Sequence, residues 1–300
     1  MGEKVLMKGN EAIGEAAIRS GCRHFFGYPI TPQTELSAYM AKKMPKINGV
    51  FLQAESEVSA INMVYGAAAA GMRAMTSSSS PGISLKAEGI SYLAAGDLPC
   101  VIVNIVRGGP GLGGIQPAQS DYFQAVKGGG HGDYHLIVLA PNSVRELAHL
   151  TAEAFNISDE YRIPTMILGD GTLGQMMEPV DLDAIPEPIY ADKPWAAKGT
   201  DNKRKKNVVE TLYLEASELE KKVLEREEKY NVVKENLQRY EAHDIDDADI
   251  IISSYGITSR VVETAVKSLR EEGIKVGVIR PITLWPFPEK IFKIIVDCIR

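Results

Sequence analysis

Short apolar runs alternate with amphipathic helical segments through the first 178 residues of the chain. The apolar runs predict strands at 23–28, 49–53, 72–76, 100–106, 136–140 and 165–169. The intervening patterns predict helices at 10–20, 33–43, 58–70, 83–95 and 143–159. Strands that alternate with helices of this length are typical of a parallel sheet with helices on both faces. The pattern therefore predicts an α/β fold for this part of the chain.

Local residues predict how some of these helices begin. Thr31 and Pro32 are interpreted as the N-cap and the first helical residue of helix 33–43. A Pro-Asn-Ser sequence offers a cap for helix 143–159. The N-terminal stretch 1–17 is charged and also helical in character.

The alternation stops at 179–200, where four prolines predict an extended crossing segment. In 201–240, 19 of 40 residues are charged. Apolar residues recur there at spacings of three and four, at Val209, Leu212, Ala216, Leu219, Val223, Tyr230, Val233, Leu237 and Tyr240, with Arg226 interrupting the series. This pattern predicts a long solvated helix. We favour a helix that rests its apolar stripe on a domain or a partner subunit over an extended coiled coil.

The α/β pattern returns after residue 248. It predicts strands at 249–254 and 275–280 and helices at 258–272 and 288–299. One such β-α-β unit is too small to close a sheet, so we expect the second domain to be incomplete in this chain. The predicted organisation is therefore a first domain over 1–182, a crossing segment with a charged helix over 183–246, and the second domain over 247–300.

Composition narrows the function classes. The 300 residues hold 33 Lys and Arg against 39 Asp and Glu, a formal net charge of −6. A mildly acidic chain lacks the basic field that nucleic acid or an anionic membrane would need. We find neither a secretory signal nor about 18 uninterrupted apolar residues, so a cytoplasmic location is expected. Cys22, Cys100 and Cys298 are scattered, which predicts reduced thiols and no metal or iron–sulfur site in this chain.

The loop after the fourth predicted strand of the first domain is the most unusual stretch. RGGPGLGGIQPAQSD at 107–121 is rich in glycine and follows a parallel strand, where ligands bind in open α/β sheets. It matches neither a P-loop nor a dinucleotide fingerprint. Arg107 at its start could clamp a carboxylate or a phosphate with two hydrogen bonds. A surface ion pair is the simpler alternative for this arginine.

Three other loops follow predicted strands. TSSSSPG at 76–82 offers hydroxyl and N–H groups at a helix start, and GYPITP at 27–32 presents the Thr31 hydroxyl between two prolines. AESEVSA at 54–60 places Glu55 and Glu57 where a helix begins. Each has an ordinary interpretation as a cap, a turn or a favourable helix-dipole contact. Because all four loops leave the same end of one sheet, they define one candidate site.

At these residues the sequence resembles the α subunits of 2-oxoacid:ferredoxin oxidoreductases, and most closely those of the 2-ketoisovalerate type. The resemblance rests on KGNEAIGEAAIRSGCRHFFGYPITPQTEL, on the stretch from FLQAESEVSA through TSSSSPGISLKAEG to NIVRGGPGLGGIQPAQSDYFQAVKGGGHGDY, and on RPITLWPFP. It covers about 1–180 and 247–300, and 183–245 lie outside most of it. It implies a pyrimidine-type thiamine-diphosphate-binding domain followed by part of a transketolase C-terminal-like domain.

The resemblance also implies the cofactor and the partners. Thiamine diphosphate would be shared with a β subunit that binds its diphosphate and Mg²⁺, and 4Fe–4S clusters would lie on partner subunits, including small ferredoxin-like subunits. The reaction implied is the oxidative decarboxylation of a branched-chain 2-oxo acid with coenzyme A and ferredoxin, in the cytoplasm of an organism with anaerobic metabolism. A hetero-oligomer is expected, with a homodimer as an alternative for the isolated chain.

Family roles map onto single residues of this chain. Glu57 falls on the glutamate that bonds the pyrimidine ring nitrogen, Thr31 on the hydroxyl that meets the 2-oxo acid, and Arg107 on the arginine that binds its carboxylate. The remaining residues implied to border the cofactor are Pro29, Ser77, Ser78, Ser79, Ser80 and Gly82. A pyruvate or 2-oxoglutarate enzyme is the alternative within this class, although the loop departs from the RGGPSTGLPT form of 2-oxoglutarate members. A non-catalytic scaffold that docks through the charged helix is the alternative of another class.

Overall fold

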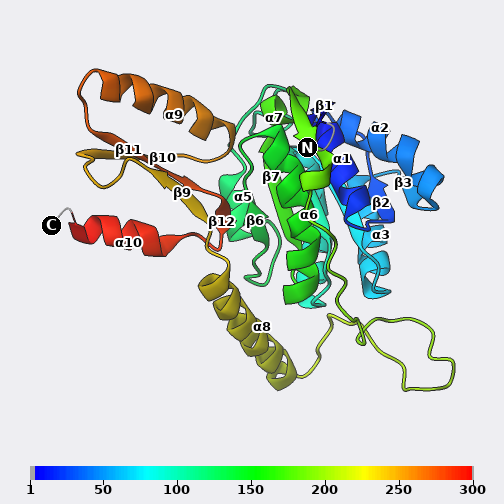
Figure 1. Cartoon of the computed structure of the whole chain (residues 1–300). Coiled ribbons are helices and arrows are strands. Elements are labelled where there is room, and N and C mark those ends of the chain that lie inside the picture. The colour runs from blue at the N-terminus through cyan, green and yellow to red at the C-terminus, as the bar shows by residue number, and fades with distance from the viewer. Residues whose placement is uncertain (1–3, 299–300) are drawn as a thin grey trace.

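A seven-stranded sheet forms the centre of the first part of the chain (Figure 1). The structure, a computed structural model, describes residues 4–298 and the side chains of 4–294. The strand order is β12-β6-β7-β5-β4-β2-β3, and all neighbours are parallel except β12, which is antiparallel to β6. These strands are β2 (His24–Gly27), β3 (Val50–Gln53), β4 (Ala74–Ser78), β5 (Val101–Val106), β6 (Ile137–Leu139), β7 (Thr165–Asp170) and β12 (Thr283–Trp285). The six parallel strands are those predicted from the sequence, within two residues at each end.

Helices cover both faces of this sheet, as the alternating pattern predicts. They are α1 (Gly9–Arg19), α2 (Thr34–Lys43), α3 (Glu57–Ala69), α4 (Ser80–Ala95), α5 (Tyr122–Lys127), α6 (Val144–Tyr161) and α7 (Gly171–Gln175), with a 3₁₀ turn over Met44–Ile47. Every residue of β5 and β7 is buried, because central strands of a parallel sheet are covered on both faces. The cap predicted for helix 143–159 is confirmed, since the Ser143 hydroxyl accepts from the Glu146 N–H.

Two predictions near helix starts are wrong. Residues 4–8 are not helical but form β1 (Lys4–Lys8), which pairs antiparallel with β8 (Met177–Asp181). Because β8 is about 170 residues away along the chain, the pairing of β1 cannot be predicted from the local pattern of apolar residues. Thr31 is not an N-cap, because α2 begins at Thr34 after the cap residue Gln33. The Thr31 and Pro32 carbonyls instead accept hydrogen bonds from Arg107 and Asn10.

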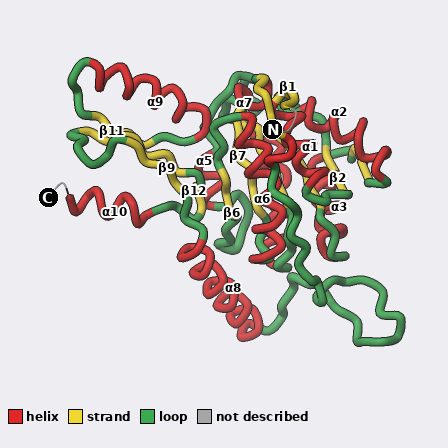
Figure 2. The backbone as a smooth tube through the Cα atoms, viewed as in Figure 1, coloured by secondary structure: helices red, strands yellow, loops and turns green. Residues whose placement is uncertain are grey.

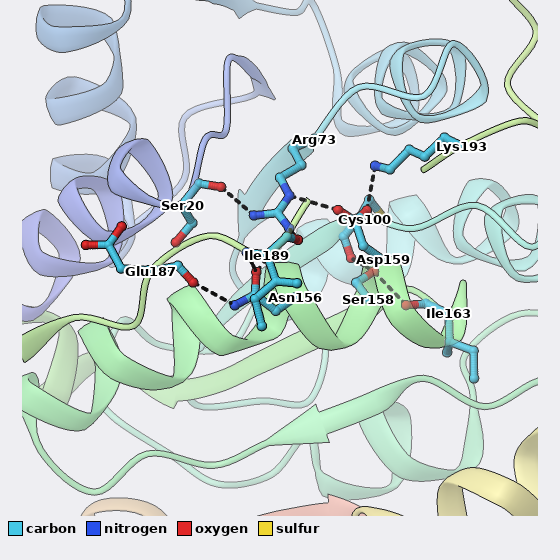
Figure 3. Close-up of polar contacts among 10 residues, drawn as sticks. All are labelled: Ser20, Arg73, Cys100, Asn156, Ser158, Asp159, Ile163, Glu187, Ile189 and Lys193. Carbon is cyan, nitrogen blue, oxygen red and sulfur yellow. Dashed lines mark hydrogen bonds and ion pairs between the residues drawn. The ribbon is translucent and has the colours of Figure 1, made fainter. Parts of the chain in front are cut away.

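A buried ion cluster fastens the crossing segment to the first domain (Figure 3). Arg73 donates from Nε to Asp159 at 2.8 Å, and Lys193 of the crossing segment pairs with the same carboxylate. Other donations from Arg73 reach the Ser20 carbonyl, the Asn156 amide oxygen and the Ile189 carbonyl. The segment therefore runs along the sheet's helical layer, starting from the 3₁₀ turn Leu182–Ala184.

The charged helix is shorter than predicted. It is α8 (Ala216–Asn236), and 201–214 run as the long loop visible in Figure 2. Asn207 explains part of the difference, because its side-chain amide bonds the carbonyls of Pro194 and Ala196 and holds this stretch against the crossing segment. Tyr230 and Val233 are buried against the first domain. This confirms a helix that rests its stripe on a domain.

The last part of the chain forms a three-stranded sheet of order β10-β11-β9. Its elements are β9 (Tyr240–His243), β10 (Ile250–Ser253), α9 (Gly256–Glu271), β11 (Val276–Pro281) and α10 (Glu289–Cys298). β9 and β12 are short strands that the sequence pattern does not show. Arg280, 1% exposed, ties this part to the first domain by pairing with Glu146 of α6 as well as with Glu241.

Membrane-spanning and metal-binding features were sought over the described residues. None of the helices there combines the length and the apolar character that crossing a bilayer needs. Nor do three or more His, Cys, Asp or Glu side chains gather there in a way that could hold a metal ion. Cys22 and Cys100 are buried free thiols, and burial raises the pKa of both. The side chain of Cys298 and residue 299 of the predicted helix 288–299 lie outside what the structure describes.

Candidate functional site

The four loops singled out in the sequence meet at the carboxyl ends of β2, β3, β4 and β5, and side-chain contacts join them. Ser77 after β4 donates to the Gln33 side chain at 2.6 Å, and Gln33 in turn donates to the Tyr28 carbonyl after β2. The Arg107 guanidinium after β5 donates to the Thr31 carbonyl at 3.1 Å. The sequence prediction of one shared site is supported by this geometry, because parallel strands bring their ends to one edge.

Glu57 is a buried carboxylate at the first position of α3. It is only 6% exposed, whereas neighbouring Glu55 points to solvent. Ser56 is the cap residue of the helix and accepts from the Ser59 N–H, so Glu57 is not needed for capping. The desolvation cost of a buried carboxylate must be offset by a polar partner. A carboxylate at the edge of a sheet can find that partner in a bound polar ligand.

Gly82 makes room for Glu57. A Cβ atom added at Gly82 would lie 2.1 Å from Ser78 Oγ and 2.8 Å from Glu57 Oε1. Ser78 Oγ and Ser79 Oγ are buried, and neither has a hydrogen-bond partner in the part of the chain that the structure describes. Buried hydroxyls are almost always paired, so two unpaired ones in the loop that packs against a buried carboxylate indicate polar groups kept for a ligand.

The other two serines of the loop are already occupied. Ser77 Oγ is bonded to Gln33, as described above. Ser80 Oγ accepts from the Arg107 N–H at 3.1 Å, and the Ser80 N–H donates to Asn104. Asn104 also donates to Asp121 at the far end of the glycine-rich loop. Ser77 and Ser80 therefore hold the site together, while Ser78 and Ser79 offer their hydroxyls to it.

Arg107 is 6% exposed, which excludes the surface ion pair considered from the sequence. Its guanidinium donates to the carbonyls of Thr31 and Leu112, and its Nε has no partner among the described residues. No carboxylate oxygen of a described side chain lies within 4.0 Å of it. A buried guanidinium bonded only to neutral carbonyls retains the capacity to bind an anion.

Thr31 and Pro29 are the exposed members of the set. The Thr31 backbone is fixed from two sides, since Arg107 binds its carbonyl and Asn10 binds the Pro32 carbonyl at 2.8 Å. Its side chain therefore stands on a rigid turn at the edge of the site. Pro29 lies in the same loop, and no hydrogen bond or ion pair ties its ring to the other site residues.

Lys86 is a site residue that sequence reasoning missed. It is fully buried on α4 and donates to Thr76 Oγ1 at 2.7 Å and to the Ser77 carbonyl at 3.0 Å. Burial lowers the pKa of its ammonium group to about 7, and the negative charge of Glu57 opposes that change. The sequence contained a signal for this burial, because its spacing from Ile83, Ile90 and Leu93 places Lys86 on the apolar face of its helix.

These groups fit the aminopyrimidine ring of thiamine diphosphate. A ring with nitrogen acceptors and an amine donor needs a carboxyl group and hydroxyl groups without partners, which Glu57, Ser78 and Ser79 supply. Gly82 lacks the Cβ atom that would clash with Ser78 Oγ and Glu57 Oε1, so these two groups can pack closely beside it.

Comparison with known proteins assigns the class. A family model described as "Pyruvate flavodoxin/ferredoxin oxidoreductase, thiamine diP-bdg" matches residues 15–256, and one described as "Pyruvate:ferredoxin oxidoreductase core domain II" matches 248–299. The chain belongs to the 2-oxoacid:ferredoxin oxidoreductase family and is an oxidoreductase subunit with a thiamine-diphosphate-binding domain.

Individual relatives narrow the class further. The chain is 51% identical to ketoisovalerate oxidoreductase subunit VorB of Methanothermobacter marburgensis, over 95% of this chain and 81% of that protein. It is 38% identical to 2-oxoglutarate synthase subunit KorA of Methanothermobacter thermautotrophicus, over 96% and 84% of the two chains. A solved 2-oxoglutarate:ferredoxin oxidoreductase from Magnetococcus marinus, with 2-oxoglutarate, coenzyme A and succinyl-CoA bound, superposes with a TM-score of 0.88 at 30% identity. That match covers 98% of this chain and 56% of the solved one.

Proposed function

We propose that the chain is the subunit that holds the aminopyrimidine of thiamine diphosphate in a 2-ketoisovalerate:ferredoxin oxidoreductase. The reaction is the conversion of a branched-chain 2-oxo acid, coenzyme A and oxidised ferredoxin to acyl-CoA, CO₂ and reduced ferredoxin. The single observation that carries the proposal is the buried Glu57 carboxylate packed against the serine loop, in which the Ser78 and Ser79 hydroxyls have no partner among the described residues. The greater identity to the VorB subunits than to the KorA subunits favours the branched-chain substrate.

Each residue has a role that follows from its surroundings. Bound thiamine diphosphate supplies the electron sink that decarboxylation requires. Glu57 holds a proton at the pyrimidine ring nitrogen, and its burial keeps water away from that hydrogen bond. Arg107 binds the carboxylate of the 2-oxo acid until it leaves as CO₂, and the Thr31 hydroxyl orients the 2-oxo group. Ser78, Ser79 and Gly82 border the ring, with Ser77, Ser80 and Pro29 shaping the loops around it.

The proposed partner subunits follow from the family to which the chain belongs. We propose a β subunit that binds the diphosphate and Mg²⁺, and partner subunits, among them ferredoxin-like ones, that carry the 4Fe–4S clusters. We propose that the assembly is a hetero-oligomer in the cytoplasm. The predicted domain boundaries of this chain lie at 182 and 246. A hetero-oligomeric enzyme agrees with relatives that are themselves named as subunits.

Reconstitution of the chain with its β and ferredoxin-like subunits tests this function. We expect thiamine-diphosphate-dependent reduction of ferredoxin or a dye, with kcat/KM highest for 2-ketoisovalerate and lower for pyruvate and 2-oxoglutarate. A higher kcat/KM for 2-oxoglutarate would reassign the substrate within the family. Absence of reduction with all three acids, together with absence of thiamine diphosphate binding by the complex, would contradict the proposal and leave a scaffold.

A further inference from the structure

Lys86 occupies an unusual position for a charged side chain. It lies in the second turn of α4, and α4 begins directly after the serine loop that borders Glu57. Its side chain extends from the buried face of α4 to the end of β4, where the ammonium group bonds Thr76 and the Ser77 carbonyl. Lysines are almost never fully buried without a charged partner, so this arrangement requires a reason beyond packing.

The partners of Lys86 are neutral. Among the side chains that the structure describes, no carboxylate oxygen lies within 4.0 Å of its Nζ atom. Glu57 is nevertheless close enough for its charge to favour the protonated lysine. When Lys86 is protonated, it and Glu57 are two buried groups of opposite charge that are electrostatically coupled without direct contact.

We propose that Lys86 is a positioning residue that acts through Glu57 and the serine loop. Its two hydrogen bonds hold the carboxyl end of β4, from which the Ser78 and Ser79 hydroxyls project. Its charge sets the electrostatic environment in which Glu57 holds the proton at the pyrimidine ring. The inference rests on the proposed function and deepens it, because it assigns a second charged group to the same site.

The consequence is a separation between binding and activation. Lys86 bonds Thr76 and the Ser77 carbonyl and not the Ser78 or Ser79 hydroxyls, so its loss should leave most of the contacts of the cofactor in place. The hydrogen bond that Glu57 makes to the pyrimidine ring should change in strength, because a buried charge acts far more strongly than one in water. The rate at which the bound cofactor loses its C2 proton should therefore fall more than the affinity for the cofactor.

The test uses the complex of this chain with its partner subunits and thiamine diphosphate. Lys86→Met keeps the length of the side chain and removes the charge, and Thr76→Val removes one hydrogen-bond acceptor and leaves the lysine in place. We would measure the Kd of thiamine diphosphate, the exchange rate of its C2 proton in D₂O and the unfolding temperature of each variant. For Lys86→Met we expect the exchange rate to fall by about tenfold to a hundredfold, as for a misplaced catalytic group, and the Kd to change by less. For Thr76→Val we expect about a fivefold fall in the exchange rate, the effect of one net hydrogen bond.

Lys229→Met is the matched control. Lys229 is partly buried, and it pairs with Asp97, beyond the opposite end of α4. Its replacement should lower the unfolding temperature and leave C2 exchange unchanged. Glu57→Gln reports on the proposed function itself and should slow exchange strongly.

The outcomes are distinguishable. Normal exchange in both Lys86→Met and Thr76→Val, with slow exchange in Glu57→Gln, would overturn the role of Lys86 and leave the proposed function standing. Normal exchange in Glu57→Gln would overturn the proposed function. If Lys86→Met does not fold, the Thr76→Val variant tests the role of Lys86 alone. Normal exchange of the C2 proton in Thr76→Val would overturn that role, and slowed exchange would support it.

Discussion

Two buried arginines at opposite ends of neighbouring parallel strands show how differently one residue type is used in this fold. Arg73 precedes β4 and is 7% exposed, and Arg107 follows β5 and is 6% exposed. Arg73 donates to Asp159, Asn156 and two backbone carbonyls (Figure 3). Arg107 bonds two carbonyls, has no carboxylate partner among the described side chains, and leaves Nε unpaired in the same set.

The difference separates a structural charge from a functional one. A buried arginine that pairs with a carboxylate and donates from all three of its nitrogens stabilises its neighbours and has little capacity left for a ligand. A buried arginine with a free donor and no counter-ion has a desolvation cost that only an anion can offset. The exposed fractions of Arg73 and Arg107 do not distinguish these roles, whereas their hydrogen-bond and ion-pair partners do. Replacing each residue therefore tests whether the distinction is real.

The largest expected effect is on catalysis at Arg107. In the reconstituted complex, Arg107→Met should lower kcat/KM for the 2-oxo acid by about 10³-fold, or about 4 kcal/mol, because a buried charge-assisted contact to the carboxylate is lost. Steady-state kinetics would measure this, with Arg107→Lys as the control that keeps the charge and should retain part of the activity. A kcat/KM near the wild-type value in Arg107→Met would place Arg107 in the same structural class as Arg73.

Arg73 should show the reverse pattern. Arg73→Met should lower the free energy of unfolding by about 3 kcal/mol, because it breaks a buried pair and leaves Asp159 with Lys193 as its remaining ion-pair partner. Denaturant titration would measure the loss, and kcat/KM of the folded fraction should stay within about threefold of wild type, because Arg73 lies at the opposite end of the sheet. Normal stability would mean that the cluster does not fasten the crossing segment.

Gly82 tests the close packing around Glu57 at the carboxyl end of the sheet, where Arg107 also lies. Gly82→Ala should lower kcat by about 10²-fold, or about 2.7 kcal/mol, because its Cβ atom would displace Glu57 and Ser78. Gly66→Ala is the matched control, since nothing lies within 4 Å of a Cβ atom there and Gly66 is inside α3. That control should gain about 0.5–1 kcal/mol of stability. Full activity in Gly82→Ala would show that the space beside Glu57 is not needed.

The smallest effect is a pH dependence at Lys86. Its folded pKa of about 7 lies below the ordinary value of 10.5, so between these values the unfolded chain binds the extra proton. Stability should therefore rise with pH above about 7, by at most about 1.4 kcal/mol per pH unit. Denaturant titrations of wild type and Lys86→Met at pH 7, 8 and 9 would isolate this contribution as the difference between the two slopes. Equal slopes would mean that Lys86 stays protonated in the folded chain.

Patterns that are local in sequence predicted much of this molecule. The six parallel strands and the helices between them have apolar faces set by their own periodicity. The loops that carry Glu57, Thr31 and Arg107 lie at one edge because the parallel strands end there. β1, β8, β9 and β12 escaped prediction because each is a short strand whose backbone pairing depends on a distant segment.

Partner assignments are what sequence alone could not supply. The sequence places Arg107 in a loop after a strand, but it does not tell that Arg73 has a carboxylate partner and Arg107 has none. Nor does it tell that Ser77 and Ser80 are bonded while Ser78 and Ser79 have no partner among the described residues. Lys86 was overlooked because a lysine in a helix normally extends to solvent. Its spacing with Ile83 and Ile90 was the available signal.

The central claim is that the Glu57 carboxylate activates the cofactor. Glu55 provides a matched control, since it lies two residues away and is exposed. The decisive measurement is 2-oxo acid-dependent dye reduction by the reconstituted complex carrying Glu57→Gln or Glu55→Gln. We expect kcat to fall by about 10²–10⁴-fold in Glu57→Gln, the usual range for loss of a general acid–base group, and to stay at the wild-type value in Glu55→Gln. Wild-type activity in Glu57→Gln, with thiamine diphosphate bound, would contradict the central claim.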